Sequence, residues 1–143
     1  IWKERLVDEI HKFSMTLQVN YARCMSRKDY VTARTCKQRG IEAAMEIYFL
    51  LKRVYPPYYK WTFKALNELD NEGTFSNLIN DISDKDINKN VWLKYDPNII
   101  NVEDEVVLLA GQIASYLLMM MKDNKLVNGE DLFLERYINQ IME

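Results

Sequence analysis

The stretch that decides the fold is VVLLAGQIASYLLMMM, residues 106–121. Its apolar residues recur at three- and four-residue steps, which places them on two adjoining stripes of one helix. Apolar cover this wide predicts a central helix that packs against several neighbours. Gly111, Gln112 and Ser115 interrupt the stretch, and its flanks lack residues suited to a membrane interface, so we expect a buried helix and not a membrane span. The stripes are Val106, Leu109, Ile113, Leu117 and Met120, and Val107, Ala110, Ala114, Leu118 and Met121.

Two long helices are predicted before this stretch. The first runs over residues 2–25, and the second over residues 29–55 with Asp29 as its cap. Gly40 lies inside the second helix, where glycine costs about 1 kcal/mol relative to alanine, so we expect a neighbouring helix to approach closely there. Pro56 ends this helix, because its ring clashes with the preceding turn. The expected inward residues are Trp2, Leu6, Ile10, Phe13, Leu17 and Cys24, followed by Cys36, Gly40, Ala43, Ile47, Leu50, Leu51 and Val54.

Shorter helices are predicted around the long ones, and no strand pattern or internal repeat occurs. The sequence therefore predicts an all-α fold, a helical bundle of four main helices plus about two short ones, in a single domain of residues 1–143. The further predicted elements are a helix over residues 58–69 with Tyr59, Phe63 and Leu66 inward, a short helix capped by Thr74, a piece holding Ile87, Val91 and Tyr95, a start of the central helix at Asn101, and a last helix opened by Glu130 and Asp131.

The composition agrees with a packed helical domain. Only 4 Gly and 3 Pro occur, which disfavours a loop-rich fold, and a hydrophobic share of 48% excludes disorder. Cys24 and Cys36 are too few for a disulfide framework, so we expect small buried residues in a reducing, cytoplasmic setting. The chain begins at Ile1 and not at Met, which suggests a piece of a larger protein, or a disordered or removed start.

Charge is divided unevenly along the chain, although the net charge is only −2. Residues 1–65 hold 13 Lys or Arg against 6 Asp or Glu, a balance of +7; residues 66–143 hold 6 against 15, a balance of −9. Two readings stay open. The halves compensate each other within the fold, or the basic half faces an anionic partner.

Few side chains could carry catalysis. His11 is the only histidine and lies off the apolar stripe, so we expect a structural or surface role for it. The run Asp84-Lys85-Asp86 has a polar setting that favours a helix cap over a metal site. No phosphate loop, nucleophile elbow, zinc-protease motif or Cys/His pair occurs. We expect no catalytic residue and no metal site in this chain.

Glu42 and Glu46 form a like-charge pair one turn apart, which destabilises the helix by about 0.2–0.5 kcal/mol. Arg39, three residues before Glu42, can bridge the pair and make it an ordinary helix surface. The alternative is a site for a cation or a substrate amine. Arg39, Glu42 and Glu46 are therefore the secondary candidate site.

Two basic clusters lie at opposite ends of the second long helix. At 1.5 Å per residue they are about 40 Å apart, so they cannot form one site. The second cluster is mixed with aromatic residues, which suits phosphates and stacked rings. The clusters are Arg23, Arg27, Lys28 and Arg34, and Lys52, Arg53, Lys60 and Lys64 with Tyr58 and Trp61; the latter six residues are the main candidate site for a substrate.

The region from residue 39 to residue 66 resembles a known family. Its run YPPYYKW, residues 55–61, followed by FKAL, residues 63–66, is similar to an uncharacterised helical domain found C-terminal to polymerase-β-like nucleotidyltransferase domains. The ending FLERY, residues 133–137, is also similar. In two-domain relatives the catalytic half carries Gly-Ser followed by an Asp-x-Asp/Glu metal pair. No glycine of this chain precedes a serine, so that half is absent here.

The resemblance implies an accessory domain that closes over, or presents, an acceptor substrate. Its expected partners are an upstream nucleotidyltransferase domain and a nucleotide or small-molecule acceptor; a nucleic acid is not expected. Mg²⁺ and a nucleoside triphosphate are expected for the missing catalytic domain, and no cofactor for this chain. Two alternatives remain: a helical protein–protein interaction module with no ligand of its own, and a stand-alone enzyme that uses Glu42 and Glu46.

Overall fold

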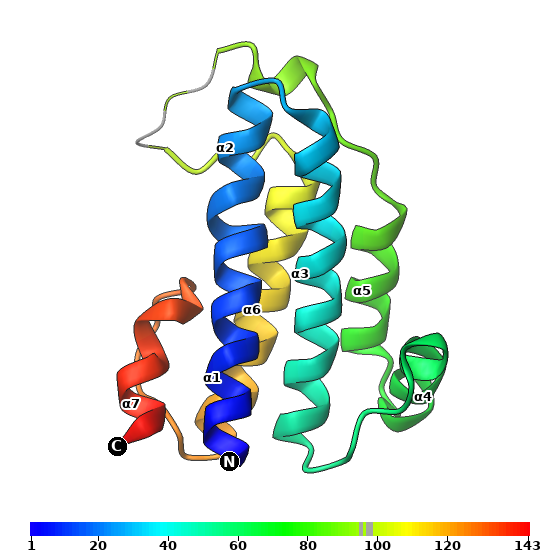
Figure 1. The fold of residues 1–143 in the computed structure, drawn as a ribbon, viewed down its shortest axis with the longest axis vertical. Helices are drawn as coiled ribbons and strands as arrows, with labels where there is room; N and C mark the ends of the chain where they lie inside the picture. The colour runs from blue at the N-terminus through cyan, green and yellow to red at the C-terminus, as the bar shows by residue number, and fades with distance from the viewer. Residues whose placement is uncertain (95, 97–98) are drawn as a thin grey trace.

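Four long helical segments form an antiparallel bundle in the computed structural model, which describes residues 1–94, 96 and 99–143 (Figure 1). The chain runs along a rod of α1, η1 and α2, returns along α3, and repeats this course with α5 and α6. No strand occurs in these ranges, so the predicted all-α bundle is confirmed. The elements are α1 (Trp2–Phe13), η1 (Ser14–Asn20), α2 (Tyr21–Ser26), α3 (Tyr30–Leu51), η2 (Tyr59–Trp61), α4 (Thr62–Leu69), α5 (Thr74–Asp84), η3 (Asn90–Trp92), α6 (Glu105–Asp123), η4 (Leu134–Tyr137) and α7 (Ile138–Met142).

The core lies between the long segments, and α6 runs through it behind the rod and α3 (Figure 1). Val106, Ile113 and Leu117 have no exposed surface, whereas Val107 and Leu109 are half-buried. The wide apolar cover of α6 thus packs against several neighbours, as predicted. Among the described helices, α6 is also the one that is long and apolar enough to cross a membrane by length and composition. Here its apolar face fills the bundle.

The predicted inward faces of the two long N-terminal helices are largely confirmed. The buried side chains include Leu6, Ile10, Phe13, Leu17 and Cys24 of the rod, and Cys36, Ala43, Ile47, Leu50 and Leu51 of α3. Trp2 is half-buried and donates its Nε1–H to the carbonyl oxygen of Leu50 at 2.8 Å. The pattern missed Tyr21, which is fully buried, and it was wrong for Val54, which is exposed because α3 ends at Leu51.

The rod changes from α to π geometry over Ser14–Asn20, which the periodicity did not predict. Thr16 Oγ1 donates to the carbonyl oxygen of Lys12 at 2.6 Å, a back-bond that competes with the regular helix ladder. Gly40 of α3 faces this turn: a Cβ on Gly40 would lie 2.4 Å from Leu17 Cγ and 2.9 Å from Thr16 Oγ1. The predicted close approach at Gly40 is confirmed, and the neighbour is the π-helical turn.

The end of α3 was misplaced by the sequence pattern. The helix ends at Leu51 and not at residue 55, because Arg53 adopts φ 59 and the chain leaves the helix there. The Val54 N–H bonds the Phe49 carbonyl at 3.1 Å and the Arg53 N–H bonds the Leu50 carbonyl at 3.1 Å, which is a Schellman ending. Pro56 therefore follows a helix that has already stopped.

Of the predicted helix caps, one is right and the others are displaced. Asp29 accepts the Thr32 N–H at 3.1 Å and caps α3. The cap of α6 is Asp104 and not Asn101, since Asp104 Oδ1 accepts the Val106 N–H at 2.7 Å. Thr74 is the first residue of α5 and makes no cap; Asp70 accepts the Ser76 N–H at 2.8 Å instead.

Asp84 and Asp86 do not begin a helix, so the expectation of a cap there was wrong. Asp84 is the last residue of α5, and Lys37 of α3 donates its ammonium to the carbonyl oxygens of Ser83 and Lys85. Burial lowers the pKa of Lys37, and this effect outweighs the carboxylates of Asp86 and Asp84, which would raise it. The C-terminus of α5 is thus closed by a cation from another helix. Of the predicted piece near residues 87–95, η3 forms and Tyr95 lies outside the described residues.

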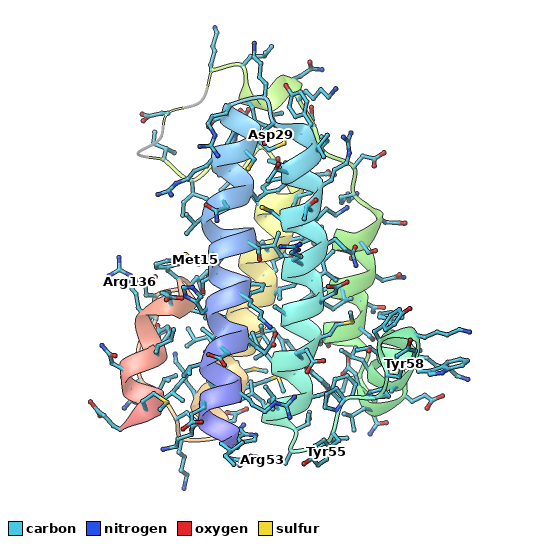
Figure 2. All side chains as sticks on the ribbon, in the orientation of Figure 1. Met15, Asp29, Arg53, Tyr55, Tyr58 and Arg136 are labelled. Carbon is cyan, nitrogen blue, oxygen red and sulfur yellow. The ribbon has the colours of Figure 1, made fainter. Side chains whose placement is uncertain are left out.

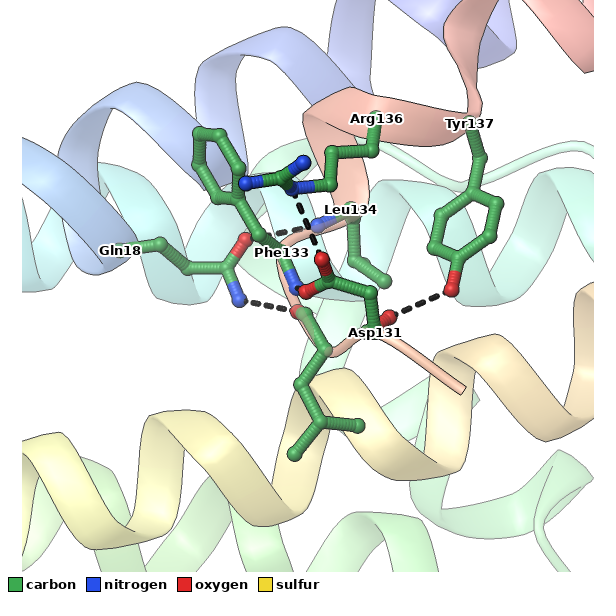
Figure 3. A network of polar contacts seen from close by, with 7 residues as sticks. Gln18, Asp131, Phe133, Leu134, Arg136 and Tyr137 are labelled. Atoms are coloured by element: carbon green, nitrogen blue, oxygen red, sulfur yellow. Dashed lines mark hydrogen bonds and ion pairs between the residues drawn. The ribbon is translucent and has the colours of Figure 1, made fainter. Parts of the chain in front are cut away.

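The last predicted helix starts later than expected, because Glu130 and Asp131 lie in an irregular segment before η4. Asp131 Oδ1 accepts the Phe133 N–H at 2.9 Å, and its carboxylate pairs with Arg136 at 2.8 Å. Gln18 of the π-helical turn donates to the Leu132 carbonyl at 2.6 Å and accepts the Leu134 N–H at 3.1 Å (Figure 3). One side of the π turn therefore docks the C-terminal segment, while the other faces Gly40.

Candidate functional site

The main candidate residues do not converge on one site. Lys52 lies over the Tyr48 ring, with Nζ 5.7 Å from the centroid. Arg53 lies over the Trp2 ring at 3.4 Å, beside a hollow of about 240 Å³ that Tyr55 and Pro56 also line. Arg53 and Tyr55 lie below the end of α3, whereas Tyr58 lies beside α4 (Figure 2). The bend therefore separates the six residues into two groups.

Lys60, Trp61 and Lys64 do come together. The Lys60 and Lys64 Nζ atoms lie 5.5 and 5.7 Å from the centroid of the Trp61 ring, and all three side chains are exposed. We call these residues with Tyr58 the basic corner. No acidic residue occurs between Ile47 and Asn67, and none of the cations Lys52, Arg53, Lys60 and Lys64 forms an ion pair with a described carboxylate.

Tyr59 and Phe63 were predicted to face the core, and this was wrong. Tyr59 is 79% exposed and Phe63 is 37% exposed, while Thr62 and Leu66 are the buried residues of this segment. The cause is η2, a 3₁₀ turn, which has fewer residues per turn than an α-helix and so rotates the inward face. Tyr59 instead contacts Tyr58, with ring centroids 4.5 Å apart. A side-chain hydrogen bond with Tyr59 raises the pKa of Tyr58.

The secondary candidates lie in a second hollow, a groove of about 810 Å³ between α1 and α3. We call it the α1–α3 groove. Its position follows from the hairpin of the rod and α3, which Gly40 brings into close contact. Tyr59 and Thr62 line one part of it, so the groove reaches the basic corner. The lining residues are Glu9, Lys12, Thr16, Gln38, Arg39, Glu42, Ala43, Met45, Glu46, Tyr59 and Thr62.

Charges in the α1–α3 groove are only partly paired. Glu9 pairs with Lys12 at 3.0 Å, which raises the pKa of Lys12. Glu46 is half-buried, and in the described part of the chain it pairs with Arg5 at 3.9 Å, while the Lys12 cation acts on it from farther away. Burial, and next the Glu9 carboxylate, raises the pKa of Glu46 above its usual range. Such a carboxylate is poorly solvated and poorly compensated.

Glu42 and Arg39 are not joined, although their spacing predicts a bridge. Glu42 accepts a long hydrogen bond from Gln38 at 3.4 Å. Arg39 is exposed and forms no hydrogen bond or ion pair with any described residue. The groove thus presents an unpaired guanidinium beside two carboxylates of the same helix.

Other predicted positions lie away from these features. His11 is exposed, as expected, and its Nδ1 lies 2.8 Å from Glu135 Oε1. Cys24 and Cys36 are buried free thiols, also as expected, and burial raises the pKa of Cys36. Within residues 1–94, 96 and 99–143, no three His, Cys, Asp or Glu side chains are grouped as metal ligands.

Sequence reasoning missed the α1 side of the groove. Glu9, Lys12 and Thr16 become part of it only because α1 packs beside α3. The i, i+3 spacing of Glu9 and Lys12 predicts their ion pair, yet gives no sign of a hollow. Gly40 was the available signal, since it marked where another helix crosses α3.

Comparison with known protein families matches residues 1–62 to a domain of unknown function, DUF4037. No curated protein and no solved structure matches the chain. Every residue that lines the α1–α3 groove lies inside the matched segment. Over residues 1–62 the chain is therefore similar to an uncharacterised domain, and the groove belongs to that part.

Proposed function

We propose that this chain is an accessory substrate-binding domain of a nucleotidyltransferase, and that the basic corner receives the nucleotide. The observation that carries the proposal is that the ammonium groups of Lys60 and Lys64 both lie near the exposed Trp61 ring. No acidic residue of this segment neutralises them. Cations beside an exposed aromatic ring suit a phosphate group attached to a planar base.

Nucleotide binding would replace the weak cation–π contacts that Lys60 and Lys64 make with Trp61. At 5.5 and 5.7 Å the two ammonium groups only loosely cover the Trp61 ring. Phosphate oxygens would draw the lysines away, because a charge-assisted hydrogen bond is stronger than an exposed cation–π contact. The uncovered ring could then stack on a base. Mg²⁺ and the phosphoryl transfer itself belong to a catalytic domain.

Titration with ATP in the absence of metal, followed by tryptophan fluorescence, tests this proposal. ATP should bind more tightly than tripolyphosphate or adenosine, since each of these lacks one half of the recognition. Lys60→Ala with Lys64→Ala should weaken ATP binding at least tenfold, about 1.4 kcal/mol, and leave the melting temperature nearly unchanged.

Arg23→Ala with Arg34→Ala is the matched control, because it removes two exposed cations at the far end of the rod and α3. If both double variants weaken ATP binding equally, the effect comes from the net charge of the protein and not from the basic corner. Trp61→Leu removes the fluorescent reporter, so its ATP affinity is measured by calorimetry; undiminished affinity would exclude stacking. A gene that encodes Gly-Ser and Asp-x-Asp/Glu upstream of Ile1 supports the catalytic assignment, and an unrelated upstream domain contradicts it.

One observation favours the second candidate, a protein–protein interaction module. Large side chains are exposed within one short segment, and aromatic side chains are enriched in protein interfaces. These are Val54, Tyr55, Tyr58, Tyr59, Trp61 and Phe63. Substituting Tyr55 distinguishes the candidates, since Tyr55 is 88% exposed and lies apart from the basic corner: Tyr55→Ala should leave ATP binding intact and weaken only a protein complex.

A further inference from the structure

The α1–α3 groove carries charges of both signs that the fold leaves incompletely paired. Glu9 and Lys12 satisfy each other at 3.0 Å. Among the described residues, Arg39 has no ion-pair partner, Glu42 has a long amide contact at 3.4 Å, and Glu46 pairs with Arg5 at 3.9 Å and also feels the Lys12 cation. These three side chains lie along one helix and line the same hollow of about 810 Å³.

We propose that the α1–α3 groove binds a small zwitterion, with its ammonium group between Glu42 and Glu46 and its anionic group on Arg39. A primary ammonium has three donors, and carboxylates one helical turn apart, with Cβ atoms about 5–6 Å apart, can both accept from it. Arg39 offers a planar pair of donors that matches a carboxylate or phosphate.

The spacing along α3 limits the size of the zwitterion. Arg39 precedes Glu42 by three residues and Glu46 by seven, which is about 4.5 and 10.5 Å of helix. Four or five methylene groups between the two charges span that range. Ala43 and Met45 provide apolar surface beside the charges, and the exposed Tyr59 also lines the groove.

The fold bears a cost at Glu46 that a bound ammonium would remove. The side chain is 30% exposed, and burial together with the Glu9 carboxylate raises the pKa of Glu46. A raised carboxyl pKa means that ionised Glu46 destabilises the folded chain at neutral pH, so Glu46→Gln should keep or increase stability. Loss of binding in that variant would therefore not come from unfolding.

The role of the zwitterion as the acceptor rests on the proposed function, whereas its binding does not. Tyr59 lines the groove and contacts Tyr58 of the basic corner. A zwitterion in the groove would accordingly extend towards the place proposed for the nucleotide. That juxtaposition makes an amine-bearing small molecule the acceptor class that fits.

The test uses four compounds of equal chain length on the ¹⁵N-labelled protein: 5-aminopentanoate, pentylamine, pentanoate and pentane-1,5-diol. Amide shifts of α3 should give the highest affinity for 5-aminopentanoate and none for the diol. Glu42→Gln with Glu46→Gln should weaken 5-aminopentanoate at least tenfold and leave pentanoate unchanged. Arg39→Gln should show the reverse, weakening 5-aminopentanoate and pentanoate while pentylamine is unaffected.

Glu68→Gln with Glu72→Gln is the control, because these two exposed carboxylates, four residues apart in the chain, lie outside the groove. Equal weakening by this pair, or diol binding as tight as the zwitterion, would overturn the inference. Absence of binding by 5-aminopentanoate also overturns it. Lys60 and Lys64 do not line the groove, so the two proposals fail independently. If ATP binds but 5-aminopentanoate does not, the zwitterion site is wrong and the proposed function stands. If 5-aminopentanoate binds but ATP does not, the zwitterion site stands and the proposed function is wrong.

Discussion

Gly40 is the residue on which the close contact between α3 and the π-helical turn depends. Alanine would gain about 1 kcal/mol of helix propensity there, but its Cβ would lie 2.4 Å from Leu17 Cγ, inside the buried core. Overpacking of this kind costs about 1–3 kcal/mol, so Gly40→Ala should be net destabilising in urea unfolding. Gly111→Ala is the control, since nothing lies within 4 Å of its added Cβ; it should stabilise α6 by about 0.5–1 kcal/mol. A more stable Gly40→Ala would show that the rod can move away from α3.

Three basic residues occupy the left-handed region at helix ends where glycine is usual. Lys28 has φ 63, Arg53 has φ 59 and Lys125 has φ 59. Lys125 follows α6 and its N–H bonds the Lys122 carbonyl at 2.9 Å. The left-handed region costs a residue with a Cβ about 1–2 kcal/mol, so Lys125→Gly should raise stability by about 1 kcal/mol in thermal unfolding. An unchanged or lower melting temperature would mean that the lysine side chain stabilises the helix end by as much.

These endings explain one limit of sequence reading at the residue scale. Asp29 could be predicted as a cap because its side chain and its position before an apolar period both indicate one. The end of α3 could not, because Arg53 carries no sign of positive φ and Pro56 offers a more obvious stop. Gly40 was readable, since glycine inside a helix needs a reason.

At the scale of elements, Asp104 ties the segment before α6 to the rod. Its carboxylate is buried and accepts from Trp92 Nε1 at 2.7 Å, Tyr21 OH at 2.9 Å and the Val106 N–H at 2.7 Å. Burial, and then Asp104, raises the pKa of Tyr21. Asp104→Ala would leave several buried donors unpaired, each costing about 1–3 kcal/mol, so we expect a loss of at least about 3 kcal/mol in urea unfolding.

Asp29→Ala is the comparison for that loss. Asp29 is an exposed helix cap with a single backbone bond, and its removal should cost about 1 kcal/mol. Similar losses for the two variants would show that the buried donors of Tyr21 and Trp92 find other partners.

Tyr48 couples α3 to α5 and makes the fold sensitive to alkali. Its ring stacks on Phe75 at 4.7 Å, and burial, followed by Asp70, raises the pKa of Tyr48 to about 12. The phenol of the unfolded chain ionises near pH 10, so stability is complete below that pH and falls as the pH rises from about 10 towards 12. Between pH 9 and pH 11 the loss from Tyr48 should be about 1 kcal/mol. Tyr48→Phe should reduce this pH dependence in urea unfolding, and the exposed Tyr55→Phe should not.

The helices themselves were largely predictable, and the site only in part. Period-3.6 stripes locate α1, α3 and α6, because burial on one face imposes that pattern. The same period gave the wrong inward face for Tyr59 and Phe63, because a 3₁₀ turn of three residues precedes α4 and changes the number of residues per turn. The α1–α3 groove was out of reach for another reason. Its carboxylates and cations come from two helices, and the pattern of a single sequence does not reveal which helices pack side by side.

For the whole molecule, the opposite charges of the two halves are joined by few ion pairs between described side chains. Of the ion pairs between described side chains, the one that joins residues 1–65 to residues 66–143 is His11 with Glu135. The cations of the basic corner have none. The asymmetry of +7 and −9 is therefore not balanced by ion pairs between the described side chains.

The last prediction concerns cooperativity. The core is one continuous cluster from Leu6 to Ile141, and α6 contacts the rod, α3 and α5 within it. Trp92, the last residue of η3, is buried and donates a hydrogen bond to Asp104. Because η3 lies at the end of the bundle far from the termini (Figure 1), Trp92 fluorescence reports that end, whereas far-ultraviolet circular dichroism reports all helices. If the bundle is one folding unit, the two urea transitions should coincide, with a slope of about 1–3 kcal/mol per molar urea. Trp2→Phe with Trp61→Phe isolates the Trp92 signal. A Trp92 transition that precedes the loss of helix would show that the segment before α6 unfolds separately, and that Asp104 ties down a region which the rest of the bundle does not need.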